Sequence, residues 1–170
     1  MSNRRNLFIA LVTAPLAMLA ITMAAAPAQA AGPTPINAWN KNNCLDNATE
    51  NASKIQMWGC SGGSEQKWLA GFNTQTSLFT FTNSHTGWCI TAPAVGAGTV
   101  TMAPCDAAAT TQQWRVFFAD NPLGPPSGWY DVWQNAASGL CLETPSLRNG
   151  TVLQTAPCDA SNLLQRWHQQ

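Results

Sequence analysis

The stretch CLDNATENASKIQMWGCSGGSEQKW, residues 44 to 68, contains the features that recur along the chain and decide its fold. It opens with Cys44-Leu45-Asp46, has a second cysteine at Cys60 and ends with Gln66-Lys67-Trp68. The same succession returns from Cys89 to Trp114 and from Cys141 to Trp167. The first cysteines of successive copies are 45 and 52 residues apart, so the sequence consists of three copies of one unit.

Cysteine spacing is nearly constant in the three copies. The two cysteines of a copy are 16, 16 and 17 residues apart along the chain. All six follow a leader that we expect to be removed on export, and an even number of cysteines in an exported chain is typical of a disulfide framework. Six cysteines allow many pairings, and their number does not choose among them.

Residues 1–30 have the layout of a secretory signal peptide. Arg4 and Arg5 precede an apolar run over residues 7–26, and the small-residue pattern Ala28-Gln29-Ala30 follows. We predict cleavage after residue 30 and an extracellular, secreted protein. The alanine-rich leader is typical of bacterial export by the Sec route, and the paired arginines resemble a twin-arginine signal.

Charge and length limit what the exported part can be. Of 8 basic and 8 acidic residues, two arginines leave with the leader, so 6 basic and 8 acidic residues remain, a net charge of −2 without a basic run. This balance disfavours nucleic acid and membrane insertion. The remaining 140 residues are enough for one domain with a hydrophobic core. We predict one domain at residues 31–170, with repeats at about 36–77, 78–124 and 125–170.

Strand-like segments precede the cysteine pairs of the second and third copies. Residues 78–81 (LFTF) and 129–133 (WYDVW) are rich in aromatic side chains, and the turn sequences NSHTG (83–87) and NAASG (135–139) follow them. Residues 120–128 (DNPLGPPSG) have the prolines and glycines of a surface loop. No segment keeps a helical period, so we predict an all-β domain.

Three such units resemble the ricin B-type lectins, also known as Q-x-W lectins, and the related carbohydrate-binding modules of secreted xylanases. The resemblance rests on the cysteine pairs, the Cys-Leu-Asp-like starts and the Gln-x-Trp ends, and covers residues 36–170. It implies a β-trefoil of about twelve strands and a non-catalytic module for a saccharide or polysaccharide, with galactose- or xylose-type ligands possible. It also implies one disulfide in each repeat: Cys44 with Cys60, Cys89 with Cys105, and Cys141 with Cys158.

Strand alternation separates two classes of tryptophan. Residues two apart in a strand share a face, so before Cys60 the apolar Ile55 and Met57 point inward while Gln56 and Trp58 point outward. An outward indole offers an apolar face for the C–H groups of a sugar ring. The alternative is a surface aromatic without function, or one covered by a loop. The tryptophans of the Gln-x-Trp ends recur in all copies and are predicted as structural core: Trp68, Trp114 and Trp167.

The first copy contains a candidate sugar site. In lectins of this family an aspartate after the first cysteine, an aromatic residue before the second and an asparagine before Gln-x-Trp form the pocket, which implies Asp46, Trp58 and Glu65 here. Gln56 and Gln66 complete the predicted set. Glu65 departs from the pattern because an ionised glutamate only accepts hydrogen bonds, whereas asparagine also donates. Either the site is weakened, or it prefers a ligand rich in donors, such as an amino sugar.

The matching positions of the other copies are poorer. The second copy has neither carboxylate nor aromatic platform, and the third has a carboxylate without a platform. The residues are Thr91, Ala103 and Thr111 in the second copy, and Glu143, Gln154, Ala156 and Leu164 in the third. We therefore predict at most one well-formed site per chain.

Two other functional classes are alternatives to sugar binding. Gly59-Cys60-Ser61-Gly62-Gly63 matches the G-x-S-x-G pattern of a serine nucleophile, but no helix follows and Cys60 is expected in a disulfide. His85 and His168 do not form a metal set once the cysteines are paired, so we predict no enzyme, metal or other cofactor. A β-trefoil can instead bind a protein partner, as a protease inhibitor or a toxin's targeting subunit does, because fold alone does not decide function.

Overall fold

A computed structural model describes residues 32–119 and 130–169. These residues belong to the second of two units into which the chain divides, Ala31–Gln170. The predicted signal peptide at residues 1–30 and the predicted loop at 120–128 lie outside the described residues. In the part of the chain that is described, no helix is long and apolar enough to cross a membrane.

The described residues form twelve strands, in three groups of four, and each group has a 3-10 turn before its last strand. The first group is β1 Thr34–Ala38, β2 Asn43–Asn47, β3 Ile55–Gly59, η1 Ser64–Gln66 and β4 Lys67–Asn73. The second is β5 Leu78–Asn83, β6 Trp88–Thr91, β7 Thr101–Pro104, η2 Thr110–Gln112 and β8 Trp114–Ala119. The third is β9 Tyr130–Asn135, β10 Cys141–Glu143, β11 Gln154–Ala156, η3 Leu163–Gln165 and β12 Trp167–Gln169.

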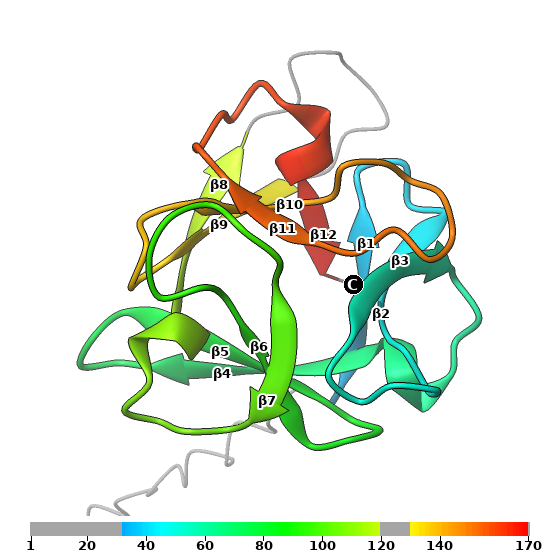
Figure 1. The fold of residues 1–170 in the computed structure, drawn as a ribbon, viewed down its shortest axis with the longest axis horizontal. Coiled ribbons are helices and arrows are strands. Elements are labelled where there is room, and N and C mark those ends of the chain that lie inside the picture. Colours follow the sequence, from blue (N-terminus) through cyan, green and yellow to red (C-terminus); the bar gives the residue numbers. More distant parts are fainter. Residues whose placement is uncertain (1–31, 120–129, 170) are drawn as a thin grey trace, which may run out of the picture. The chain divides into compact units, whose positions relative to one another are not determined.

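Six of the strands close a barrel. Antiparallel pairing runs from β1 to β4, β5, β8, β9, β12 and back to β1. The other strands form the hairpins β2–β3, β6–β7 and β10–β11. Figure 1 shows the three groups in three sectors around a common centre. This is the β-trefoil that the family resemblance implied, and the all-β fold class predicted from the sequence is confirmed.

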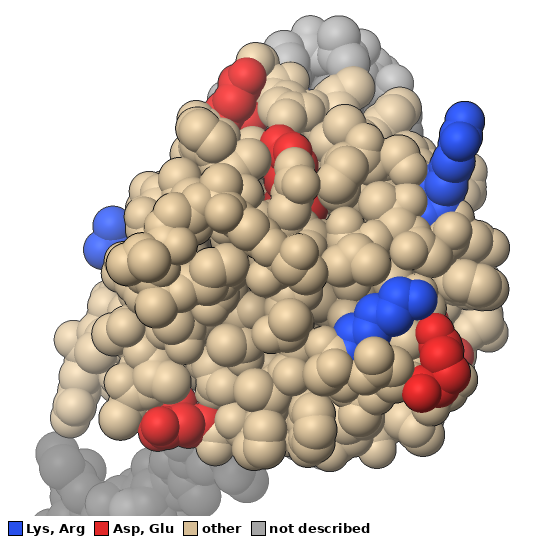
Figure 2. Space-filling model, viewed as in Figure 1, with Lys and Arg blue, Asp and Glu red and all other residues tan. Residues whose placement is uncertain are grey.

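Charged side chains are sparse on the surface. The face shown in Figure 2 carries a few scattered blue and red side chains on a mainly uncharged background. An ion pair joins Lys54 Nζ to Glu50 Oε1 at 3.3 Å. The fold therefore depends on its core and backbone pairing rather than on surface ion pairs.

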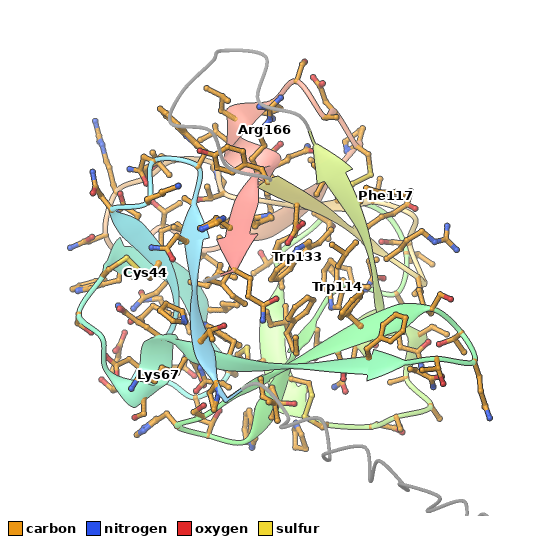
Figure 3. The ribbon with its side chains drawn as sticks, turned by 180° about the vertical axis from the view of Figure 1, so that it is seen from behind. Cys44, Lys67, Trp114, Phe117, Trp133 and Arg166 are labelled. Carbon is orange, nitrogen blue, oxygen red and sulfur yellow. A yellow bond between two sulfur atoms is a disulfide. The ribbon has the colours of Figure 1, made fainter. Side chains whose placement is uncertain are left out.

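The barrel is filled by the tryptophans of the Gln-x-Trp ends, which are fully buried. Each indole Nε1 donates to a backbone oxygen one residue after the first cysteine of its repeat: Trp68 to Leu45 at 3.1 Å, Trp114 to Ile90 at 3.3 Å, and Trp167 to Leu142 at 3.2 Å. Trp133 stacks on Phe81 with ring centroids 3.8 Å apart. Figure 3 shows Trp114 and Trp133 inside the barrel. The recurring tryptophan thus fills the core and satisfies its own N–H.

One disulfide joins the strands of each outer hairpin region, as the family resemblance implied. The bonds are Cys44–Cys60, Cys89–Cys105 and Cys141–Cys158, so the predicted pairing is confirmed.

The turns predicted at residues 83–87 and 135–139 form, and the strands before them extend two residues beyond their predicted ends. Asn83 and Asn135 are the last residues of β5 and β9. The amides of Gly87 and Gly139 donate to the carbonyls of these asparagines at 2.8 and 2.9 Å. Both glycines have positive φ, 70° and 69°, which glycine adopts without steric cost.

Candidate functional site

The β2–β3 hairpin brings the candidate residues of the first repeat onto one face. In its register Asp46 lies opposite Gln56, and Cys44 lies opposite Trp58. Asp46 and Trp58 are therefore diagonal neighbours, close enough for long side chains to share a surface. Trp58 points outward and keeps 42% of its surface exposed. The Cys44–Cys60 disulfide closes the hairpin beside this indole.

A hollow of about 210 Å³ opens at this face. Four of the five predicted residues line it, together with three residues that the sequence did not single out as sugar contacts. The lining residues are Asp46, Thr49, Glu50, Gln56, Trp58, Ser61 and Glu65. Thr49 and Glu50 lie in the connection between β2 and β3, where strand alternation does not predict the direction of a side chain. No sequence signal pointed to them.

The carboxylate of Asp46 is held by two amide side chains. Nε2 of Gln56 donates to Oδ1, and Nε2 of Gln66 donates to Oδ2, each at 3.0 Å. Asp46 is only 5% exposed. Hydrogen bonds to an ionised group are strong, so this carboxylate is already oriented before any ligand arrives.

Gln66 is a framework residue and does not line the hollow. It is 1% exposed, donates from Nε2 to the Gly59 carbonyl at 3.1 Å as well as to Asp46, and accepts from the Ser61 amide at 2.7 Å. We expected Gln66 to contact sugar, and the structure corrects this because both of its amide hydrogens are used within the protein.

The same arrangement recurs in the other two repeats. Gln112 and Gln165 donate to the carbonyls of Pro104 and Pro157 at 3.0 and 2.9 Å, and accept from the amides two residues further on at 2.8 and 2.9 Å. The glutamine of Gln-x-Trp therefore ties the end of each outer hairpin to the 3-10 turn, whether or not a hollow is present.

Gln56 differs from the expectation in its exposure. It shares the outward face of β3 with Trp58, but only 3% of its surface is exposed. It lies opposite Asp46 in the hairpin and donates to it, and its backbone pairs with Val152 of the third repeat. Its Oε1 is buried and has no hydrogen-bond partner among the described residues. Since a buried, unpaired acceptor is costly, this oxygen is a natural contact for a ligand donor.

Glu65 lies in η1 at the rim of the hollow, half-buried. Its Oε1 accepts the Ser61 hydroxyl at 3.0 Å, and its backbone oxygen accepts from Asn83 of the second repeat at 2.8 Å. Glu65 is thus positioned from both sides, and its carboxylate adds negative charge to the hollow.

The charge around the hollow is negative. Three of its lining side chains are acidic and none is Lys or Arg. Glu50 forms the ion pair with Lys54, and its hydrogen bond with its own backbone N–H, together with the bond from Lys54, lowers the pKa of Glu50.

The third repeat contributes the edge of the site next to Trp58. Asn149 Oδ1 accepts from the Gly59 amide at 2.8 Å, and the Gly150 amide donates to the Met57 carbonyl at 2.9 Å. A side chain at Gly150 would begin 4.0 Å from the Trp58 ring. These contacts join residues about ninety positions apart, so nothing local in the sequence could predict them.

The positions that correspond to the first-repeat hollow hold other side chains in the second and third repeats. In the second repeat the hydroxyl of Thr91 accepts from Gln112 at 3.1 Å, with no aromatic platform. In the third repeat the carboxylate of Glu143 accepts from Gln154 at 2.8 Å, Asn162 at 3.0 Å and Gln165 at 2.9 Å. Asn162 was not predicted, because it stands three residues before Gln165 and not directly before it.

Ser61 does not have the surroundings of a nucleophile elbow. It lies in the segment after β3, which leads to one 3-10 turn and not to an α-helix. Its hydroxyl donates to Glu65 at 3.0 Å and accepts from the Gly63 amide at 3.2 Å, while Cys60 is in its disulfide. The serine thus helps to fix Glu65.

Comparison with known proteins places this geometry in a family. The sequence profile described as the ricin-type β-trefoil lectin domain matches residues 32–121, more than half of the chain. The chain belongs to the ricin-type β-trefoil lectin domain family. No curated protein sequence matches it significantly.

Solved structures with the ricin-type β-trefoil lectin fold are similar along most of the chain. A designed threefold-symmetric protein, ThreeFoil, aligns with a TM-score of 0.68 at 18% identity, over 82% of this chain and 98% of its own. The hemolytic lectin CEL-III aligns with a TM-score of 0.61 at 18% identity, over 82% of this chain and 32% of its own. An exo-β-1,3-galactanase from Clostridium thermocellum aligns with a TM-score of 0.65 at 18% identity, over 81% of this chain and 30% of its own. At these identities the similarity shows the fold.

Proposed function

We propose that this domain is a secreted, non-catalytic carbohydrate-binding module with one well-formed sugar site, in the first repeat. The observation that carries the proposal is the exposed indole of Trp58 at the same hollow as the oriented carboxylate of Asp46. Membership of a lectin family agrees with it.

The indole of Trp58 and the carboxylate of Asp46 can bind the apolar face and the hydroxyl groups of one sugar ring. The C–H face of a pyranose ring stacks on an indole, while neighbouring hydroxyls donate to a carboxylate. A hollow of about 210 Å³ suits a single sugar unit rather than a long chain segment. A lone site of this kind binds with a Kd between millimolar and micromolar, about −4 to −8 kcal/mol.

The class of sugar is part of the proposal. Galactose- and xylose-type ligands are the first to test, because of the lectin and xylanase-module resemblance, and because a galactanase is among the similar structures. The partner is a saccharide or polysaccharide displayed outside the cell.

A glycan array and a polysaccharide pull-down test the proposal with a matched pair of variants. Trp58→Ala removes the platform, and Phe117→Ala removes an aromatic side chain of almost equal exposure, 43%, from β8. The native protein and Phe117→Ala should bind the same saccharides, while Trp58→Ala should lose at least about tenfold in affinity, or about 1.4 kcal/mol.

Three outcomes would contradict parts of the proposal. Binding that survives Trp58→Ala would place the sugar elsewhere. Release of reducing ends from a bound polysaccharide would show catalysis. Inhibition of a protease panel that is unaffected by Trp58→Ala would favour the protein-binding alternative. Secretion is checked separately, by N-terminal sequencing of the exported protein, which should begin at Ala31.

A further inference from the structure

We propose that the first-repeat hollow selects a positively charged amino sugar, with the ammonium group of a deacetylated hexosamine placed among the carboxylates. This inference rests on the proposed function and names its ligand class. It follows from the hydrogen-bonding groups of the hollow, the comparison with the third repeat, and the charge and aromatic group beside them.

The polar groups of the hollow are mainly acceptors. Both oxygens of Asp46 accept, Glu65 accepts from Ser61, and the buried Oε1 of Gln56 has no partner among the described residues. One N–H of Gln56 and the hydroxyl hydrogen of Ser61 are already used to hold these carboxylates. An ammonium group has three N–H donors and no acceptor, so it matches this set better than a hydroxyl group, which must also accept.

The third repeat shows what the first repeat lacks. There, Glu143 accepts from three amide side chains, and the third donor is Asn162. The residue at the corresponding position of the first repeat, three before the glutamine, is Gly63, which has no side chain. Asp46 therefore accepts from two side chains where Glu143 accepts from three, and a ligand can provide the missing donor.

The charge and the aromatic group favour a cation in the same place. Asp46, Glu50 and Glu65 line the hollow, and no lysine or arginine does. Glu50 is paired with Lys54, so Asp46 and Glu65 are the carboxylates of the hollow that take part in no ion pair among the described residues. Trp58 adds the face of an indole, the side chain that attracts cations most strongly through its ring electrons.

A metal ion is a poorer occupant than an organic cation. Across residues 32–119 and 130–169, no group of three or more His, Cys, Asp or Glu side chains is close enough to hold a metal. A metal ion needs several such ligands around it, whereas an ammonium group needs only acceptors for its three N–H groups, and the rest of the sugar ring can contact Trp58.

Isothermal titration with three matched trisaccharides tests the inference. The β-1,4-linked trimers of glucosamine, N-acetylglucosamine and glucose differ only at carbon 2, which carries an ammonium, an acetamide or a hydroxyl group. The native protein should bind the glucosamine trimer at least about tenfold more tightly than the other two. The preference should decrease as salt is raised, because part of it is electrostatic.

Two variants complete the experiment. Glu65→Gln keeps the size of the side chain and removes its charge, and should reduce the preference for the glucosamine trimer several-fold. Asp106→Asn neutralises an exposed carboxylate of the second repeat and should leave the preference unchanged. Equal affinity for the charged and neutral trimers, or a preference that Glu65→Gln does not change, would overturn the inference and leave the proposed function standing. If no saccharide in either experiment binds, both fail.

Discussion

Trp58 and Trp68 are ten residues apart and differ completely in exposure, 42% against 0%. Trp58 occupies the outward register of β3, while Trp68 is in β4, whose inward face closes the barrel. The same side chain is therefore available as a ligand platform in one place and is core in the other. Around Trp58, the proposed sugar site depends on single side chains, and Glu65 is the one that departs from the family pattern.

At the residue scale, we predict that Glu65→Asn strengthens the binding of neutral sugars several-fold. Asparagine supplies a donor where glutamate only accepts, and the change removes a negative charge near Asp46. Calorimetric titration of the native protein and the variant with the best neutral ligand of the glycan array measures the effect. An affinity that does not increase would count against the role given to Glu65, and Asp106→Asn serves as the control for charge alone.

The Gln-x-Trp turn is the element that repeats most faithfully. In all three copies its glutamine donates near the end of the first outer strand and at the end of the second, and accepts from an amide just after the second cysteine, while its tryptophan enters the barrel. Because these bonds are the same in repeats with and without an aromatic platform, the element belongs to the framework.

This element predicts the effect of Gln112→Ala in the second repeat. The change leaves the Asp106 amide and the Pro104 carbonyl without their present partner, so the free energy of unfolding should fall by about 2 kcal/mol. Sugar binding should not change, because the proposed site lies in the first repeat. Urea unfolding and the pull-down measure the two effects, and weakened binding by the folded variant would show that the second repeat takes part.

A second prediction at this scale concerns Asp131 of β9, which pairs with Trp167 of β12. Burial raises the pKa of Asp131 from 3.8 to about 6. Between these values the folded protein holds the proton more tightly than the unfolded chain, so this carboxyl group stabilises the fold below pH 3.8 and loses that effect as pH rises through about 6.

Asp131→Asn, which cannot ionise, should therefore be more stable than the native protein above pH 6, by on the order of 1 kcal/mol after allowance for the partial exposure of the carboxylate. Below pH 4 the advantage should disappear. Thermal unfolding across this pH range measures the difference. An advantage that is the same at every pH would mean that ionisation of Asp131 has no part in it.

At the scale of the whole molecule, the three disulfides supplement a barrel with very few ion pairs among the described residues. Their loops have nearly equal lengths, with separations of 16, 16 and 17 residues. On the chain-entropy account each contributes about 3 kcal/mol, so together they are comparable with the whole stability of a typical domain.

Because the disulfide loops are nearly equal in length, removal of any one disulfide should lower the stability by a similar amount, while the effect on sugar binding should depend on which disulfide is removed. Replacement of both Cys44 and Cys60 by alanine, or of both Cys89 and Cys105, should lower the free energy of unfolding by about 3 kcal/mol. Only the first pair lies beside Trp58, so only its removal should also weaken sugar binding. Urea unfolding and titration of the two variants test this, and equal binding by both would separate the disulfide from the site.

Much of the fold could be predicted from local properties of the chain. Three copies at regular spacing, turn sequences and alternating side chains predicted an all-β domain of three repeats, and the family resemblance added the trefoil and the cysteine pairs. Alternation also placed Trp58 on the outside of β3. These properties depend on residues that are close in sequence, where the two-residue period of a strand decides which side chains share a face.

The tertiary structure alone decided the rest of the site. Gln56 is on the predicted face but buried, Gln66 turns inward, and Thr49 and Glu50 join the hollow from a connection that has no strand period. Asn149 reaches the edge of the site from a segment about ninety residues away. Such contacts form where the three repeats pack around one barrel. Because they join segments that are far apart in the sequence, no periodic pattern within a single segment predicts them.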